Sequence, residues 1–192
     1  MLVLKFVIKN NLNLAVVPKY STYHGKLLKR LTTMTIFTDK KILIFDECKF
    51  MANLLHTMLV CFDVGQVIVC TTLKEAKYNL ENNTFDCVFC DWSSWPDPKL
   101  DCLECIRSRS KMEDPATPVI VCTGKTTLPD VMFARDKGCN EIVTKPIAPS
   151  NVFDKLYSTL NNTREFILNE SYTGPDRRRN KGDFSGASEE VY

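Results

Sequence analysis

Apolar residues recur along the middle of the chain in short, nearly continuous runs. The runs are KILIF (41–45), QVIVC (66–70), CVFCD (87–91), PVIVC (118–122) and EIVTK (141–145). A strand with one face in water alternates apolar and polar residues, whereas a strand buried on both faces shows an unbroken apolar run. The pattern therefore predicts five strands of a parallel sheet that is covered on both faces.

The segments between these runs repeat their apolar residues every three or four positions, which is the spacing of an amphipathic helix. The predicted helices cover residues 50–62, 73–81, 103–110, 128–138 and 150–160. Gly138 is expected to cap the end of the fourth helix, and Ser150 the start of the fifth. Strands that alternate with helices predict βαβ units with right-handed crossovers, and hence a doubly wound α/β fold.

Both ends of the chain lose this alternation. Residues 1–38 hold six lysines or arginines and no acidic residue, and we expect a poorly ordered basic extension there. Residues 39–162 form the predicted domain. Residues 163–192 gain glycine, serine and mixed charge, and are predicted to be a disordered polar tail.

Composition narrows the classes of protein that fit. Beyond residue 38 the chain has 19 basic against 23 acidic residues, so direct DNA binding is not expected. No run approaches the roughly 18 to 20 apolar residues that span a bilayer. Nine cysteines, an odd number scattered over the chain, do not indicate a disulfide framework. We therefore expect a cytoplasmic protein with reduced thiols and no membrane span.

Chemically useful side chains stand where the predicted strands end, and these ends meet at one edge of an open α/β sheet. They are Asp46 and Glu47, Asp91, Thr123, and Lys145. Adjacent carboxylates repel one another and need a cation, and oxygen ligands with open water positions suit Mg²⁺. A lysine and a hydroxyl would bind the oxygens of an incoming phosphoryl group, and aspartate is a known acceptor. The set predicts phosphoryl transfer to an aspartate.

Four cysteines offer a competing interpretation. Cys87 with Cys90, and Cys102 with Cys105, form two CxxC pairs whose spacing hints at a zinc ribbon. However, residues three apart in an extended run point to opposite faces, and CVFC lacks the tight, often glycine-containing turn of a zinc knuckle. Cysteine as a small buried hydrophobe accounts for all four, so the carboxylate site is favoured.

Residues 40–160 resemble the receiver domain of bacterial two-component response regulators. The matching pieces are ILIFDE, FDCVFCDW, TPVIVCTG and ARDKGCNEIVTKPI with the helix that follows. The resemblance implies a flavodoxin-like sheet in the order 2-1-3-4-5, and Asp91 as the phosphoacceptor. It also implies Mg²⁺ bound by Asp46, Glu47, Asp91 and the backbone carbonyl of Ser93, Thr123 as the switch hydroxyl, Lys145 as the phosphate-binding lysine, and a cis Lys145–Pro146 bond.

The chain departs from this family in two places. The loop after the acceptor, WSSWPDPKLDC, is longer than usual and has Cys102 where a glycine is expected. Ile142 stands where the family usually has the tyrosine or phenylalanine whose burial reports phosphorylation. The tail GPDRRR resembles tails on some receiver proteins, and its role does not follow from these residues.

The resemblance implies a stand-alone response regulator rather than an enzyme acting on other substrates. A sensor histidine kinase or phosphotransfer protein would phosphorylate Asp91, and the domain would signal through altered contacts with a downstream protein. The alternative is a non-phosphorylated receiver that serves as an interaction module, which Ile142 and the unusual loop favour. A phosphatase of the haloacid dehalogenase type is set aside, because FDECKF has Cys48 where that family needs a second aspartate.

Overall fold

The computed structural model describes residues 36–92, 102–108, 114–125, 127–161 and 164–177. The chain divides into two compact units, residues 1–36 and 37–192, and the second contains every described residue except the first. Within that unit, Phe37 is fully buried and its carbonyl accepts hydrogen bonds from the amides of Lys40 and Gly65. The folded domain therefore begins before residue 39, the predicted boundary. The remainder of the predicted basic extension lies outside the described residues.

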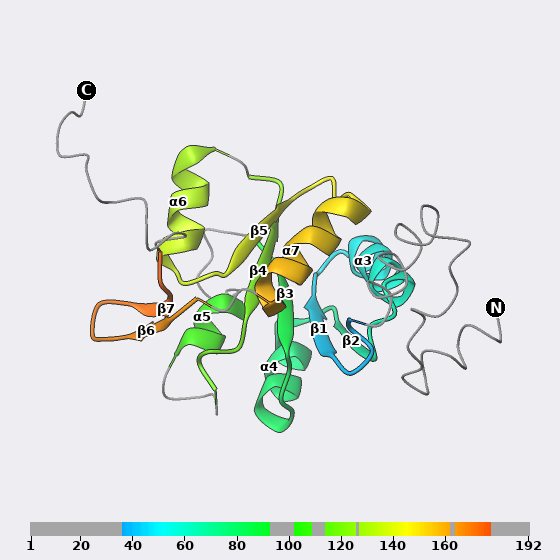
Figure 1. Cartoon of the computed structure of the whole chain (residues 1–192), viewed down its shortest axis with the longest axis horizontal. Helices are drawn as coiled ribbons and strands as arrows, with labels where there is room; N and C mark the ends of the chain where they lie inside the picture. Colours follow the sequence, from blue (N-terminus) through cyan, green and yellow to red (C-terminus); the bar gives the residue numbers. More distant parts are fainter. Residues whose placement is uncertain (1–35, 93–101, 109–113, 126, 162–163, 178–192) are drawn as a thin grey trace, which may run out of the picture. The chain divides into compact units, whose positions relative to one another are not determined.

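Five parallel strands form the central sheet in the order β2-β1-β3-β4-β5, which confirms the predicted fold (Figure 1). The strands are β1 (Lys41–Phe45), β2 (Gln66–Cys70), β3 (Cys87–Asp91), β4 (Val119–Thr123) and β5 (Glu141–Thr144). Every residue of β3 and β4 is buried, as their unbroken apolar runs predicted. The sheet order places β1 beside β3, with Phe45 opposite Cys90, so Asp46 and Asp91 follow at the same level.

Helices cover both faces of the sheet. They are α3 (Lys49–Cys61), α4 (Leu73–Asn82), α5 (Cys102–Arg107), α6 (Leu128–Asp136) and α7 (Pro149–Asn161). Buried residues of α4, α5 and α6 form one core cluster with alternate residues of the strands, such as Leu43, Val88 and Val121. The other residues of the same strands lie outside that cluster, as the alternation of side chains along a strand requires. In the part of the chain that the structure describes, no helix is both long and apolar enough to traverse a bilayer.

The helix ends show where local sequence signals succeed and where they fail. Thr72 and Glu75 form a reciprocal capping box at the start of α4. Gly138 follows the end of α6 with φ +89°, a conformation that glycine adopts readily. The predicted cap at Ser150 is wrong, because α7 begins one residue earlier at Pro149. Proline suits the first helical position, where its missing N–H would have no helical partner.

The segment after α7 differs from the disordered tail that the sequence predicted. Strands β6 (Phe166–Leu168) and β7 (Thr173–Pro175) pair antiparallel in a hairpin. The Asn169 side-chain oxygen closes the turn by accepting hydrogen bonds from the amides of Ser171 and Tyr172. We call residues 164–177 the C-terminal hairpin. Residues 178–192 lie outside the described part of the chain.

Candidate functional site

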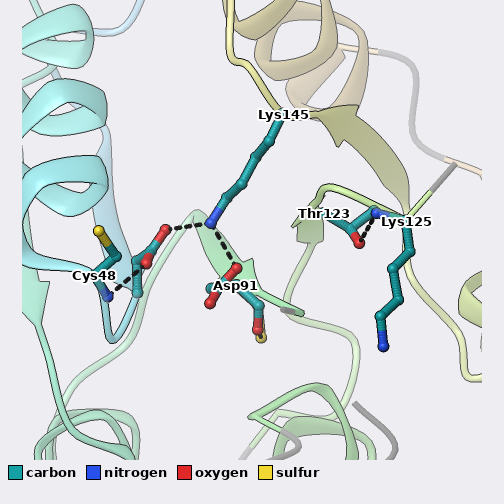
Figure 2. A network of polar contacts seen from close by, with 7 residues as sticks. Cys48, Asp91, Thr123, Lys125 and Lys145 are labelled. Carbon is teal, nitrogen blue, oxygen red and sulfur yellow. Dashed lines mark hydrogen bonds and ion pairs between the residues drawn. The ribbon is translucent and has the colours of Figure 1, made fainter. Parts of the chain in front are cut away.

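Two carboxylates and one ammonium meet at the carboxyl edge of the sheet. The Lys145 ammonium donates hydrogen bonds to Asp46 Oδ2 at 2.8 Å and to Asp91 Oδ1 at 2.7 Å (Figure 2). Asp46 is only 4% exposed and Asp91 8%. We call these three residues the ion cluster. The adjacency of β1 and β3 brings the aspartates together, and Lys145 directly follows the last residue of β5. The Lys145–Pro146 bond is cis, as the family resemblance implied.

Burial and mutual repulsion set the electrostatics of the ion cluster. Burial raises the pKa of Asp46 above its usual value, and this outweighs the lowering effect of Lys145; the charge of Asp91 adds to the increase. Burial pushes the pKa of Lys145 down, but its hydrogen bonds to both aspartates prevail and the net shift is upward. The lysine therefore stays charged at neutral pH and serves as the internal counter-ion of the carboxylates.

The residues predicted to bind Mg²⁺ are only partly brought together. Asp46 and Asp91 contact the same ammonium, so a cation near that point would have two carboxylate oxygens at hand. Glu47 is exposed, and the described residues contain no group of three His, Cys, Asp or Glu side chains arranged to hold a metal. Ser93 lies outside the described residues. Because Mg²⁺ keeps several waters and often takes one or two protein carboxylates, Asp46 and Asp91 fit it.

Thr123 ends β4 at the same edge of the sheet and is buried. Its hydroxyl accepts a hydrogen bond from the Lys125 amide at 3.0 Å, so the side chain is tied to the start of the following loop. In Figure 2 the Thr123 hydroxyl is joined to the Lys125 amide and not to Lys145 or Asp91. The hydroxyl therefore lies at the same edge of the sheet but is engaged with its own loop.

A small hollow lies beside Thr123, and Trp92 and Ile142 contribute to its walls. Trp92 directly follows Asp91, is 8% exposed, and stacks on Phe133 of α6 with ring centroids 5.7 Å apart. The sequence analysis did not predict this contact of Trp92 with α6. A large aromatic residue immediately after a fully buried strand was the available signal, because the chain is still inside the domain there.

The cysteines of the two CxxC pairs do not present a thiolate site. Cys87 and Cys90 lie in β3, and only Cys90 belongs to the core cluster with Cys102, as expected for residues three apart in a strand. Burial raises the pKa of the Cys87 thiol far above its usual value. All nine cysteines of the chain are free thiols.

Comparison with known proteins identifies the class of this domain. The family described as "Response regulator receiver domain" matches residues 42–157. The chain therefore belongs to the response regulator receiver family of two-component systems. No curated protein sequence matches the chain at a significant level.

Solved structures support the same fold. A CheY-like response regulator receiver domain protein from Methanospirillum hungatei JF-1 is 24% identical, with TM-score 0.54, and the match covers 64% of this chain and 94% of that one. The receiver domain of the Francisella response regulator 1452 is 22% identical, with TM-score 0.56, over 65% and 99% of the two chains. Chemotaxis protein CheY4 of Vibrio cholerae is 18% identical, with TM-score 0.56, over 63% and 98%.

Proposed function

We propose that this receiver accepts a phosphoryl group on Asp91 from a histidine kinase or a phosphotransfer protein, and that the modified domain signals by changed contacts with a downstream protein. One observation carries the proposal: the Asp91 carboxylate, at the end of the central strand, is held 2.7 Å from a lysine ammonium that also binds Asp46. That arrangement supplies an acceptor oxygen and a fixed positive charge for phosphoryl oxygens.

In the transfer, a carboxylate oxygen of Asp91 attacks phosphorus and forms a new P–O bond, while the bond from phosphorus to the donor breaks and its electrons leave with the donor. Lys145 turns from Asp91 towards the phosphoryl oxygens, and the Thr123 hydroxyl can donate to another. Asp46 and Asp91 would hold Mg²⁺, with Glu47 and the Ser93 carbonyl as further proposed ligands. When bound, the ion neutralises charge on the transferred group.

The location and partners of the reaction are part of the same proposal. Free thiols fit a reducing compartment such as the cytoplasm, where kinases of this class present their phosphorylated histidines. The domain catalyses only its own phosphorylation and dephosphorylation.

The test is phosphorylation by a small donor. The full chain is incubated with acetyl phosphate and Mg²⁺, and its intact mass is measured. We expect the gain of one phosphoryl group in the wild type, none in Asp91→Asn, and none when Mg²⁺ is chelated. Asp154→Asn makes the same charge change at an exposed position of α7 and should behave as the wild type.

The alternative, a receiver that acts as an interaction module without phosphorylation, has one observation in its favour. The Lys145 ammonium already offsets part of the charge of the two buried carboxylates, so the ion cluster can persist without a metal or a phosphoryl group. If the folded wild-type protein gains no mass under these conditions, the result would favour the interaction module over the phosphorylated receiver.

A further inference from the structure

The C-terminal hairpin lies beyond residues 42–157, which the receiver family covers, and its first attachment is a buried arginine. Arg107, at the end of α5, is 6% exposed and stands 5.5 Å from the centre of the Phe166 ring in β6. Its guanidinium donates to the carbonyls of Gly138, Pro115 and Thr117 and to Asn140 Oδ1, at 2.7–3.0 Å. One side chain thus joins α5, the start of β4 and the turn after α6, and the hairpin covers it.

The second attachment is to the turn that ends α6. A Cβ placed on Gly138 would lie 2.3 Å from the Thr173 carbonyl oxygen, and one placed on Gly174 would lie 2.6 Å from Gly138 Cα. Two backbones therefore touch where no side chain fits. Arg164 donates to the carbonyls of Asn140 and Asp176. The hairpin is consequently fixed to the C-terminal end of α6.

A third contact links the hairpin to α6 itself. Arg177 pairs with Asp136, the last residue of α6, at 3.5 Å, and lies 4.2 Å from the centre of the Tyr172 ring. The Tyr172 hydroxyl donates to the Pro175 carbonyl at 2.8 Å and so braces the hairpin from within.

Helix α6 is also tied to residues that neighbour the ion cluster. The helix begins at Leu128, shortly after Thr123, and Phe133 stacks on Trp92, the neighbour of Asp91. Ala134 is its single buried residue, whereas Leu128 is 72% exposed. The hollow beside Thr123 borders the same helix. A helix with a single buried residue shifts at lower cost than one that is packed deeply into the core. α6 is therefore well placed to respond to a change at Asp91.

We propose that the C-terminal hairpin is an autoinhibitory clasp, which holds α6 in the position that belongs to unmodified Asp91. This inference rests on the proposed function. In the described state Lys145 binds Asp91 and the Thr123 hydroxyl accepts from the Lys125 amide. A phosphoryl group competes for both groups, and the resulting shift of the Thr123 loop passes directly to the start of α6. Because coupling between two sites is reciprocal, phosphorylation loosens the hairpin, and a docked hairpin disfavours the phosphorylated state.

Hydrogen exchange tests the first direction. The amides of Asn169 and Asp176 donate to the carbonyls of Tyr172 and Glu165 across the hairpin and report its closure. The full chain is compared with and without acetyl phosphate and Mg²⁺, and the phosphorylated fraction of each sample is measured by intact mass. We expect exchange at these two amides to rise about fivefold or more in phosphorylated protein. Unchanged or slower exchange in phosphorylated protein overturns the clasp and leaves the proposed function standing; a protein that gains no phosphoryl group overturns both.

Affinity for a phosphoryl mimic tests the second direction. Beryllium trifluoride with Mg²⁺ is titrated calorimetrically into the full chain. Gly174→Ala, whose new methyl group would collide with Gly138 Cα, should bind the mimic about fivefold or more tightly. Leu168→Ala, at a 52% exposed position of the same hairpin, should bind as the wild type does. Should Gly174→Ala fail to fold, Arg177→Ala removes the surface contacts with Asp136 and Tyr172 and should shift affinity in the same direction by less. Unchanged or weaker binding in a folded variant with a faster-exchanging hairpin overturns the proposal.

Discussion

Replacing Lys145 by methionine removes the positive charge of the ion cluster while keeping an unbranched side chain. The lysine, Asp46 and Asp91 side chains are 16%, 6% and 4% exposed, so water does little to replace the lost ammonium. Removing one partner of a buried ion pair typically costs 3–5 kcal/mol. Because Asp46 has a raised pKa and can take up a proton, we expect the lower end, about 3 kcal/mol of unfolding free energy at pH 7.5.

The loss of unfolding free energy in Lys145→Met should depend on pH, and the direction of that dependence follows from the pKa of Asp46. Without Lys145, the pKa of Asp46 in the folded domain rises further above the unfolded value of 3.8. A group whose folded pKa is raised stabilises the fold fully below its unfolded pKa, and that contribution is lost as pH rises through the folded pKa. The deficit of Lys145→Met should therefore shrink on acidification from pH 7.5 towards pH 4.5, by up to about 1.4 kcal/mol for each pH unit per proton taken up.

Urea unfolding of the wild type and Lys145→Met at pH 7.5, 6 and 4.5 measures both effects. Lys155→Met is the matched control, because Lys155 also pairs with a carboxylate, Glu141 at 2.8 Å, but its side chain is 30% exposed. We expect a loss under about 1 kcal/mol for this control, with little pH dependence. The reasoning fails if Lys145→Met loses less than about 1 kcal/mol at pH 7.5, or if its deficit is the same at all three pH values.

Three further substitutions test the packing described above. Arg107→Met should lower the free energy of unfolding, measured by urea unfolding, by about 3 kcal/mol, because two buried backbone carbonyls lose their hydrogen-bond donor. The control Arg135→Met, at an exposed position, should cost under about 0.5 kcal/mol. Equal losses in the two variants would contradict this prediction. Thr72→Ala should cost about 1 kcal/mol by removing the cap of α4, and Thr72→Ser should retain most of it. Gly65→Ala places a methyl group 2.2 Å from the Thr38 carbonyl oxygen and should lower the melting temperature measured by circular dichroism; an unchanged value would show that this turn can open.

The central sheet could be predicted because each strand is an apolar run of its own. A strand that is buried on both faces has few polar residues to interrupt its apolar run. Strands β3 and β4 were therefore easy to recognise in the sequence. The C-terminal hairpin could not be predicted in the same way. Its strands have three residues each, too few for a periodic signal, and its attachments are to groups far away in the sequence, such as Arg107.

The site was predicted in outline because parallel topology alone brings strand ends together. Asp46, Asp91 and Lys145 meet as that argument requires. The charge balance was not predicted: the sequence argument treated the carboxylates as repelling groups in need of a metal, whereas the chain supplies its own ammonium between them. Whether a lysine ammonium or a bound metal ion offsets the charge of a carboxylate depends on how far the lysine side chain reaches in the folded domain. The spacing of residues in the sequence does not encode that distance. Whether Glu47 and Ser93 bind Mg²⁺ stays a prediction.

The contact between Gly138 and Gly174 joins two positions that are 36 residues apart and leaves room for only a hydrogen atom on each. Neither glycine can be replaced by alanine in evolution while the two backbones remain in contact. Receivers that share this C-terminal addition should therefore keep both glycines as a pair. A receiver whose chain stops after α7 has no need of the second glycine, whereas the φ of +89° at Gly138 favours glycine in either case. The hairpin glycine, Gly174, would therefore mark a distinct lineage within the family.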